Sequence, residues 1–369
     1  MAFGLNTYPV VYRAKYDTGN WREEYLEKAH KTPAEEAALD SAAAAALADS
    51  RNCYPDMPLV SYTSQYGYGV FEGLKALPQK DGGLAIFRPD QNAARFARSM
   101  KGLYMPPFPE ELFLKAVTGT VRRNAALGFS LVYDPAWEKD AFSNAPAVYI
   151  RPFSCSEGAI GVSIAKAPWV ICICSPVTAY YSDASSDAVV SGRIRANPRG
   201  TGWIKCAANY VISALAKHEA NEGGFVECVF LDAVERKYFE EGSSCNIFFY
   251  LKSGELVTPE LGDTILPGIT RLSVIELAQD RGVRVSERKI SVEEVLSEAR
   301  ECFFCGTAAG ATPFTSLTCQ GRKTVFNKGK EGELTAELRR TLKGIQYGLI
   351  EDRKGWLHHV SRSNEGRAD

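Results

Sequence analysis

Apolar residues recur along the chain in two alternating textures, short β-rich runs and longer amphipathic stretches. Apolar runs typical of strands occur at 10–12, 83–88, 148–153, 169–174, 225–232 and 238–251. Helical spacing is found from Thr32 onward and over 90–99, 110–127, 206–221, 270–279 and 343–359. Because strands and helices mix in both halves, the pattern predicts an α/β or α+β fold.

Residues 182–202 differ in texture from the rest. They are rich in Ser, Asp, Gly, Asn and Pro and carry few large apolar side chains, which favours a linker. A chain of 369 residues also fits two domains. The alanine run 42–48 predicts a short exposed helix that Ser41 caps, and it is far too short to span a bilayer.

Composition excludes several classes of protein. The formal net charge is −1, so no strongly basic field is available to gather phosphates, which argues against nucleic acid as a partner. Most of the ten cysteines sit inside apolar runs, where a free thiol behaves as a small hydrophobe. The first residues contain no basic segment followed by an apolar one, so we expect no signal peptide. These observations favour a reduced, cytoplasmic protein without membrane association.

Several familiar motifs fail on spacing. Gly67, Gly69 and Gly73 do not fit the dinucleotide fingerprint, and no Gly-Lys-Ser/Thr phosphate loop exists. Cys302 and Cys305 have no second pair, which argues against a closed zinc site. The four histidines stand in no metal or triad context; they are His30, His218, His358 and His359.

Lys205 is the most informative single residue. It has apolar neighbours on both sides and follows a glycine-softened approach that includes Gly200 and Gly202. A partly desolvated lysine amine has a lowered pKa and serves as a nucleophile toward a carbonyl. A lysine on a solvated face is the alternative interpretation.

Three further segments change the balance. Residues 265–271 form a tight turn into a helix, whose free backbone amides suit an anion. Residues 304–309 form a second turn of small residues after a strand, and Glu240 and Glu241 precede an apolar strand. A lysine, two phosphate cradles and an inward acid are the parts of a pyridoxal phosphate site.

With these segments in view, the sequence resembles the branched-chain amino acid aminotransferases, which are class IV (fold type IV) pyridoxal phosphate enzymes. The matching stretches occur in family order from about residue 60 to 350, whereas the first fifty residues match less well. These stretches are 66–76, 87–90, 149–152, 205–210, 241–246 and 265–271.

The resemblance implies roles in cofactor binding. Lys205 resembles the Schiff-base lysine that holds pyridoxal 5′-phosphate and shuttles the substrate proton. Glu241 resembles the partner of the ring nitrogen, Tyr210 that of the ring hydroxyl, and Arg95 the arginine that grips the phosphate. The residues expected to complete the phosphate cradle are Ile269, Thr270 and Thr307.

The resemblance also implies a substrate pocket. Arg151 resembles the group that accepts the distal carboxylate of glutamate. The aromatic wall around an aliphatic side chain is expected from Tyr66, Phe71, Tyr149 and Tyr180. The α-carboxylate site is expected from Ser244, Ala308 and Ala309.

Two departures from the family pattern concern polar and thiol groups. Ser244 stands where some relatives carry threonine. The redox CxxC of vertebrate mitochondrial relatives is replaced by the sequence 308–311, so thiol regulation is not expected there. Cys302 and Cys305 are not its substitute.

The implied architecture is a smaller N-terminal α/β domain of residues 1–179, a linker at 180–195 and a larger, barrel-like C-terminal domain of residues 196–369. The cofactor is expected between the domains. Family members are homodimers in which a loop of one subunit closes the pocket of the other. Here that loop is expected at 156–162, with Ile160 and Val162 facing the neighbour.

The resemblance therefore implies transamination of leucine, isoleucine or valine with 2-oxoglutarate, and it does not rank these three amino acids. The alternatives within the fold are a D-amino acid aminotransferase and an aminodeoxychorismate lyase. A pyridoxal phosphate-binding protein without catalytic activity is the alternative from another class.

Overall fold

The computed structural model describes residues 6–140, 142, 145–177 and 186–360. The described chain forms two compact units. The N-terminal unit holds residues 6–177 and 345–360, and the central unit holds residues 186–344. The expectation that residues 345–360 belong to the C-terminal domain is wrong, because the strand Leu357–Val360 pairs with residues 84–87. The N-terminal unit, expected to be the smaller, is therefore the larger.

The N-terminal unit is built on one antiparallel sheet, in which seven strands of the described residues follow the order β17-β4-β3-β5-β6-β1-β2. They are β1 (Val10–Asp17), β2 (Asn20–Glu27), β3 (Leu74–Gln79), β4 (Gly83–Phe87), β5 (Ala147–Cys155), β6 (Trp169–Val177) and β17 (Leu357–Val360). The edge strand β2 is half-buried or exposed throughout and rich in charge, which discourages pairing with other chains.

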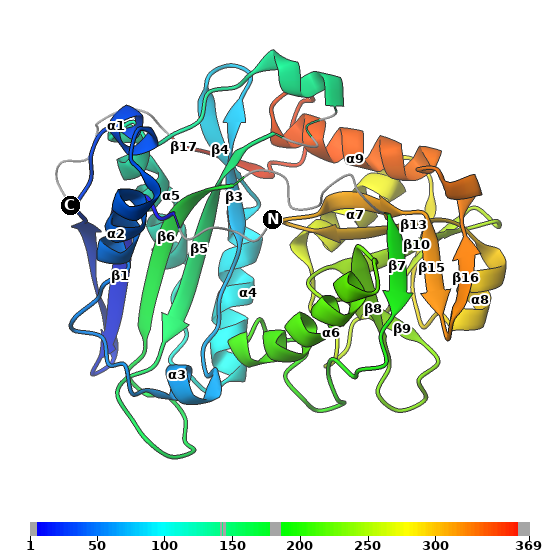
Figure 1. The fold of residues 1–369 in the computed structure, drawn as a ribbon, viewed down its shortest axis with the longest axis horizontal. Helices are drawn as coiled ribbons and strands as arrows, with labels where there is room; N and C mark the ends of the chain where they lie inside the picture. Colours follow the sequence, from blue (N-terminus) through cyan, green and yellow to red (C-terminus); the bar gives the residue numbers. More distant parts are fainter. Residues whose placement is uncertain (1–5, 141, 143–144, 178–185, 361–369) are drawn as a thin grey trace. The chain divides into compact units, whose positions relative to one another are not determined.

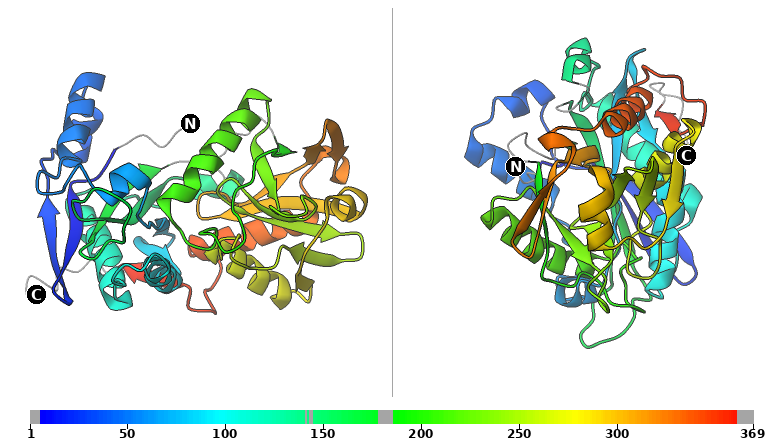
Figure 2. Two further views of the ribbon diagram at one scale, coloured as in Figure 1. Left: turned by 90° about the horizontal axis from the view of Figure 1, so that it is seen from below. Right: turned by 90° about the vertical axis from the view of Figure 1, so that its right-hand side faces the viewer.

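Two long helices cover this sheet. Helix α4 (Pro89–Gly102) lies beside α5 (Glu110–Ala126), and α5 contacts β1, β5 and β6 (Figures 1 and 2). The buried rings of Phe96 and Phe113 join the two helices, with centroids 5.3 Å apart. The remaining helices of this unit are α1 (Pro33–Ala37), α2 (Ser41–Arg51), α3 (Tyr62–Tyr66) and the 3-10 turn η1 (Pro135–Asp140).

The alanine-rich helix α2 is anchored at its end by Arg51. This side chain is 1% exposed; it donates to the carbonyls of Thr7 (2.9 Å) and Ala29 (3.0 Å) and pairs with Glu36. Asp40, not Ser41, caps the helix, because its carboxylate accepts from the amide of Ala43 at 2.8 Å. The expected exposed helix is present, but its predicted cap is wrong.

The central unit contains two sheets, each with five strands among the described residues, in the orders β12-β11-β10-β13-β14 and β16-β15-β7-β8-β9. The strands of the first are β10 (Asn246–Leu251), β11 (Glu255–Thr258), β12 (Arg284–Glu287), β13 (Ala299–Gly306) and β14 (Gly310–Phe314). Those of the second are β7 (Asp187–Val190), β8 (Glu227–Leu231), β9 (Phe239–Gly242), β15 (Ser316–Cys319) and β16 (Arg322–Val325).

The two sheets share one hydrophobic core. It includes Ala188, Val229, Phe239, Ile247, Phe249, Phe304 and Leu317. Around it lie α6 (Tyr210–Glu222), α7 (Ile269–Asp280), α8 (Val292–Glu298), α9 (Glu333–Gln346) and the 3-10 turns η2 (Ala207–Asn209) and η3 (Asn327–Gly329). Two sheets around a common core, with helices outside, agree with the expected barrel-like domain.

Three local predictions are wrong. Residues 187–190 form β7 between β15 and β8, so part of the expected linker is a strand. The predicted helix 343–359 is instead the end of α9 followed by β17, and Gly348 and Gly355 adopt positive φ between them. Helix α4 begins after Arg88 without a side-chain cap, so Asp90 is not its N-cap.

Within the described ranges, no helix combines the length and hydropathy of a membrane span.

Candidate active site

Lys205 lies in the central unit, in the irregular segment just before η2 and α6. Its amine donates to the hydroxyl of Tyr210 at 2.8 Å. Asn209 holds the segment that precedes Lys205, because its side-chain amide donates to the carbonyls of Thr201 (2.7 Å) and Ile204 (2.9 Å). The structure thus brings together two residues that the sequence analysis assigned to one site.

Glu241 is the buried acid of the site. It lies in β9 and is 3% exposed. One carboxylate oxygen pairs with Arg195 Nη2 at 2.5 Å, and the other accepts from Asn246 Nδ2 at 3.2 Å. Burial raises the pKa of Glu241 to about 7, while Arg195 and Lys205 oppose this rise. Glu240 has a different partner: it accepts from the hydroxyl of Thr264 at 2.6 Å.

The start of α7 offers an anion site. Gly268 is the N-cap, and among the described residues no side chain caps this helix. The first amides therefore keep their hydrogen-bonding capacity and the positive end of the helix dipole for a ligand. A Cβ on Gly268 would lie 1.9 Å from Asn246 Oδ1, so this close approach requires glycine. Ile269 and Thr270 follow as the first two helical residues.

Two further turns lie beside this helix start. Residues 307–309 form the turn between β13 and β14, and they are half-buried. A Cβ on Gly306 would contact the carbonyl of Ser244 at 3.7 Å, so the turn at 243–245 is adjacent. Asn246 Nδ2 also donates to the carbonyl of Leu266 at 2.9 Å. Ser244 therefore lies beside Gly306, and Asn246 connects the start of β10 to Glu241. The roles of Ser244, Thr307, Ala308 and Ala309 stay predictions.

These residue types suit a phosphorylated pyridine aldehyde. The uncapped helix start suits the phosphate, and the buried carboxylate of Glu241 suits a cationic ring nitrogen. Lys205 is the amine that such an aldehyde requires. The central unit thus fits pyridoxal phosphate through its own side chains and backbone.

Arg95 lies in the N-terminal unit, on α4. It is 5% exposed, and its Nε and Nη2 donate to the two carboxylate oxygens of Glu72, each at 2.7 Å. Asn92 donates to the same carboxylate at 2.7 Å. Glu72 thus orients the guanidinium, and the phosphate contact of Arg95 stays a prediction.

Arg151 forms a second polar group in the N-terminal unit. Its guanidinium carbon lies 4.6 Å from the ring centroid of Phe71 and 5.1 Å from that of Tyr149. Nη2 donates to the Tyr149 hydroxyl at 2.7 Å. Nε is buried and has no hydrogen-bond partner among the described residues. A Cβ on Gly73 would lie 2.3 Å from the Tyr149 hydroxyl, so any larger residue here would have to displace this phenol.

Two further aromatic residues, Tyr66 and Tyr180, are expected around the substrate. Tyr66 ends α3 and stacks on Tyr62 at 6.5 Å between centroids. Tyr180 lies outside the described residues. The structure therefore joins Phe71, Tyr149 and Arg151, and the roles of Tyr66 and Tyr180 stay predictions.

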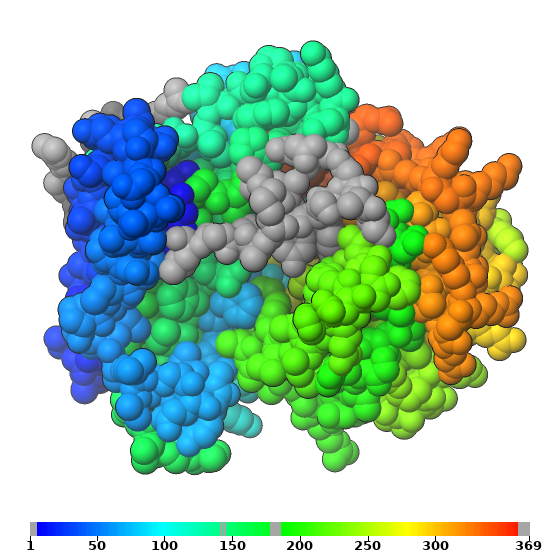
Figure 3. All heavy atoms as spheres, viewed as in Figure 1, coloured from blue at the N-terminus to red at the C-terminus, as the bar shows by residue number. Residues whose placement is uncertain are grey.

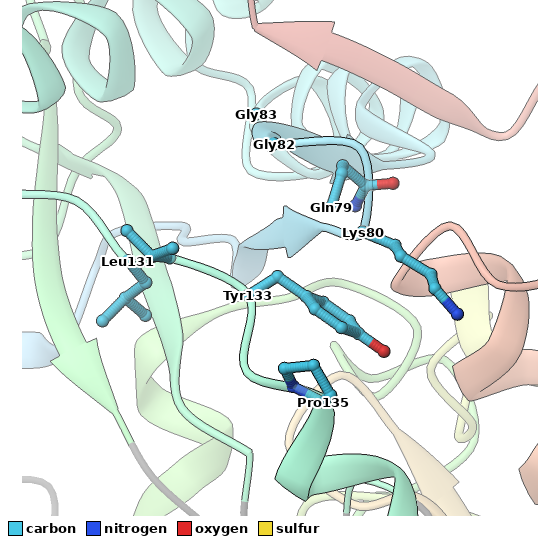
Figure 4. A pocket seen from close by; sticks show the side chains of 8 residues that line it. Gln79, Lys80, Gly82, Gly83, Leu131, Tyr133 and Pro135 are labelled. Carbon is cyan, nitrogen blue, oxygen red and sulfur yellow. The ribbon is translucent and has the colours of Figure 1, made fainter.

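A separate pocket of about 300 Å³ opens in the N-terminal unit between the β3–β4 turn and residues 131–135. Lys80 and Tyr133 line it, and Figure 4 shows their side chains extending in the same direction. Both reach Glu138, at 3.5 Å and 2.8 Å. These two contacts tie Lys80 and Tyr133 to the 3-10 turn that carries Glu138.

Sequence reasoning missed Arg195 and Asn246 as functional candidates. Asn246 stands inside a quoted motif, but one of its two hydrogen bonds goes to the carbonyl of Leu266, 20 residues away. Arg195 stands in the expected linker, where a lone basic residue carries no signal.

Cys302 and Cys305 are buried in β13, and burial raises the pKa of both thiols, which agrees with inert cysteines.

Comparisons with known proteins decide the family. The model of amino-transferase class IV matches residues 69–317. The chain belongs to the class IV aminotransferase family. It is 39% identical to the branched-chain-amino-acid aminotransferase of Mycolicibacterium smegmatis over 308 residues, which are 80% of this chain and 81% of the relative.

Solved structures agree. The branched-chain aminotransferase of Thermoproteus uzoniensis with norvaline has a TM-score of 0.71 and 30% identity, covering 83% of this chain and 95% of its own. A branched-chain amino acid aminotransferase from T.th. with pyridoxamine 5′-phosphate has a TM-score of 0.70 and 31% identity, covering 83% and 94%.

These findings confirm several predictions. The chain is an aminotransferase with the α/β fold of type IV enzymes, and the branched-chain interpretation is supported over the D-amino acid aminotransferase and the aminodeoxychorismate lyase. A binding protein without catalytic activity is not supported. Pyridoxal phosphate is confirmed as the cofactor of the family.

Proposed function

We propose that this aminotransferase transfers the amino group of leucine, isoleucine or valine to 2-oxoglutarate, giving branched-chain 2-oxo acids and L-glutamate. Pyridoxal 5′-phosphate is the cofactor. The observation that carries the proposal is the Lys205–Tyr210 contact of 2.8 Å in the same site as buried Glu241. The names of the relatives support the substrate class.

Each residue of the central unit has a defined task. Pyridoxal phosphate, when bound, supplies an aldehyde that links to amines and a ring that accepts their electrons. Lys205 attaches the cofactor and later carries the proton of the substrate α-carbon on Nζ. Tyr210 orients that amine, and the carboxylate of Glu241 would accept a hydrogen bond from the ring nitrogen and keep it protonated. The amides at the start of α7 bind the phosphate with Ile269, Thr270 and Thr307.

Substrate recognition needs a site for two kinds of side chain. The Arg151 group combines aromatic faces with a buried N–H donor that has no partner among the described residues. The rings of Phe71 and Tyr149 suit an aliphatic side chain, whereas the guanidinium suits the distal carboxylate of glutamate. Ser244 and the amides at Ala308 and Ala309 bind the α-carboxylate that all substrates share.

A coupled turnover assay tests the function. L-Leucine with 2-oxoglutarate should be consumed, and D-alanine should be a poor donor. Lys205→Ala should abolish turnover, while Lys289→Ala, which removes an exposed lysine of the same unit, should leave it intact. Equal rates with D-alanine, or substantial activity of Lys205→Ala, would contradict the proposal.

We also propose a homodimer. In the loop 156–162, Ile160 is 80% and Val162 95% exposed. The backbone amide of Ala159 donates a hydrogen bond to the carbonyl of Val60 (3.2 Å), and an isolated antiparallel β-bridge joins Ser61 to Gly158. These contacts hold the loop in place. Burial of such residues against a second copy stabilises association.

A second exposed apolar face supports the dimer. On α6, Val211 is 62% and Leu215 43% exposed, and the helix lies on the surface seen in Figure 3. Light scattering should give the mass of a dimer, and Val162→Asp should weaken it. Val234→Asp, in another exposed turn, is the control. A wild-type monomer would contradict the proposal.

All ten cysteines lie in the described part of the chain, and none of them forms a disulfide. We propose that the protein works in a reducing compartment such as the cytoplasm, because free thiols persist there.

A further inference from the structure

Glu241 is held by two side chains that come from different segments. Arg195 Nη2 lies 2.5 Å from Oε1, and Asn246 Nδ2 lies 3.2 Å from Oε2. The amide of Leu266 adds a longer contact of 3.4 Å to Oε1. Both carboxylate oxygens therefore have fixed directions before any ligand binds.

Arg195 also makes two bonds to the backbone. Nη1 donates to the carbonyl of Thr264 at 3.0 Å, and Nη2 donates to that of Gly202 at 3.3 Å. Gly202 lies three residues before Lys205, and Thr264 lies four residues before Gly268. The Arg195 guanidinium thus connects Glu241 to the segment that precedes Lys205 and to the segment that precedes α7.

The charges around Glu241 act in opposite directions. Arg195 and Lys205 favour the carboxylate, whereas burial and the neighbouring Glu240 favour the protonated acid. From β13, Cys305 faces the same carboxylate, and burial keeps its thiol protonated. Burial is the largest of these effects, and the net pKa of about 7 already includes the opposing contribution of Arg195. Loss of Arg195 would therefore move the pKa of Glu241 above neutral pH.

We propose that Arg195 is a positioning residue that keeps Glu241 ionised and ties it to the segments leading to Lys205 and α7. A protonated Glu241 could neither balance the charge of a protonated ring nitrogen nor accept its hydrogen bond as a carboxylate does. Arg195 therefore acts on the reaction through Glu241, without contact with the substrate. This inference rests on the proposed role of Glu241 toward pyridoxal phosphate.

The test compares Arg195→Gln with Arg195→Lys. Gln removes the positive charge, whereas Lys keeps it but cannot reproduce the fork of donors. Arg193→Gln is the matched control, because Arg193 lies two residues earlier and pairs with Glu219 at the surface. The first measurement is the pH profile of kcat for L-leucine, together with the absorption spectrum of the bound cofactor without substrate across the same pH range.

Loss of an opposite charge close to a carboxylate raises its pKa by about 1–3 units. In Arg195→Gln, the acidic limb of the kcat profile and the pH dependence of the spectrum should move upward by that amount. Arg195→Lys should shift them by less than about one unit, and Arg193→Gln should shift neither. An unchanged limb in Arg195→Gln, or an equal shift in Arg195→Lys, would overturn the proposal.

The second measurement uses cofactor-free protein. Glu241 has a higher pKa in the folded state than in the unfolded chain. It therefore stabilises the fold at a pH below its pKa in the unfolded chain, and this stabilisation is lost as the pH rises through its pKa in the folded state. The decline in thermal stability should therefore extend about 1–3 pH units higher in Arg195→Gln than in the wild type. An identical decline in both proteins would also overturn the proposal.

The proposed function and the role of Arg195 can be told apart experimentally. If wild-type protein neither binds pyridoxal phosphate nor turns over L-leucine, the proposed function is wrong, and the cofactor-free measurement still tests the Arg195–Glu241 pair. If the wild type is active but Arg195→Gln shifts nothing, only the inference about Arg195 is wrong. Should Arg195→Gln not fold, the profile of Arg195→Lys decides: an acidic limb near that of the wild type supports the charge role, and a full shift contradicts it.

Discussion

The amine of Lys205 donates a hydrogen bond to the hydroxyl of Tyr210 across 2.8 Å. Lys205 lies in an irregular segment, whereas Tyr210 is the first residue of α6. The 3-10 turn Ala207–Asn209 lies between them and runs directly into α6, so the phenol comes from the first residue of this helix. The contact fixes the direction of Nζ before substrate binds.

Replacement of Tyr210 tests the value of this contact. A hydrogen bond to a charged group contributes about 1.5–3 kcal/mol, so Tyr210→Phe should lower kcat by about 10- to 100-fold. The pH dependence of the cofactor spectrum should change as well, because the phenol faces the amine that carries the proton. Steady-state kinetics and a spectral titration measure both, and unchanged values would contradict the assigned role.

Gly268 tests the anion site at α7. A Cβ at this position would lie 1.9 Å from Asn246 Oδ1, so Gly268→Ala must displace either Asn246 or the helix start. Overpacking of this kind costs about 1–3 kcal/mol, and the Kd of pyridoxal phosphate should rise at least several-fold. Gly262→Ala is the control, because a Cβ there meets no described atom within 4 Å. Equal cofactor affinity in both variants would contradict a phosphate site at α7.

Arg151 separates the two substrates. Removal of one partner of a buried charge pair costs about 2–5 kcal/mol, so Arg151→Met should lower kcat/KM for glutamate by about 30-fold or more. Leucine keeps the rings of Phe71 and Tyr149 and should lose much less. Stopped-flow half-reactions measure each substrate alone. Equal losses would show that Arg151 only supports the aromatic rings.

The pKa of Glu241 predicts how stability depends on pH. Because this pKa is raised from 4.5 to about 7 in the fold, its contribution is complete below pH 4.5 and is lost as pH rises through 7. Relative to Glu241→Gln, the cofactor-free wild type should lose roughly 3 kcal/mol between pH 4 and pH 8. Urea unfolding at several pH values measures the difference. A constant difference would show that Glu241 does not titrate in this range.

Much of the fold could be predicted from local patterns. Strands β5 and β6 and helix α5 follow from apolar runs and helical spacing that the chain carries locally. The edge strand β2 is charged and contains no apolar run. The pattern therefore predicts a strand at 10–12, within β1, but none at β2. The strand β17 owes its conformation to β4, about 270 residues earlier in the chain, and local spacing therefore predicts a helix there.

The site divides in the same way. Lys205 and Glu241 stand in recognisable sequence contexts, so a motif identifies them. At Gly73 and Gly268 a Cβ would displace the Tyr149 hydroxyl or the Asn246 side-chain amide, a constraint that only the folded chain shows. Arg195 reaches Glu241 across 46 residues of sequence, and nothing near Arg195 marks it as functional.

The absorption spectrum of the protein loaded with pyridoxal phosphate tests the central claim most directly. Addition of stoichiometric L-leucine without 2-oxoglutarate should convert the spectrum to that of the pyridoxamine form and release the matching 2-oxo acid. Subsequent 2-oxoglutarate should restore the original spectrum and yield L-glutamate. A spectrum that L-leucine leaves unchanged, or that D-alanine converts equally well, would contradict the account.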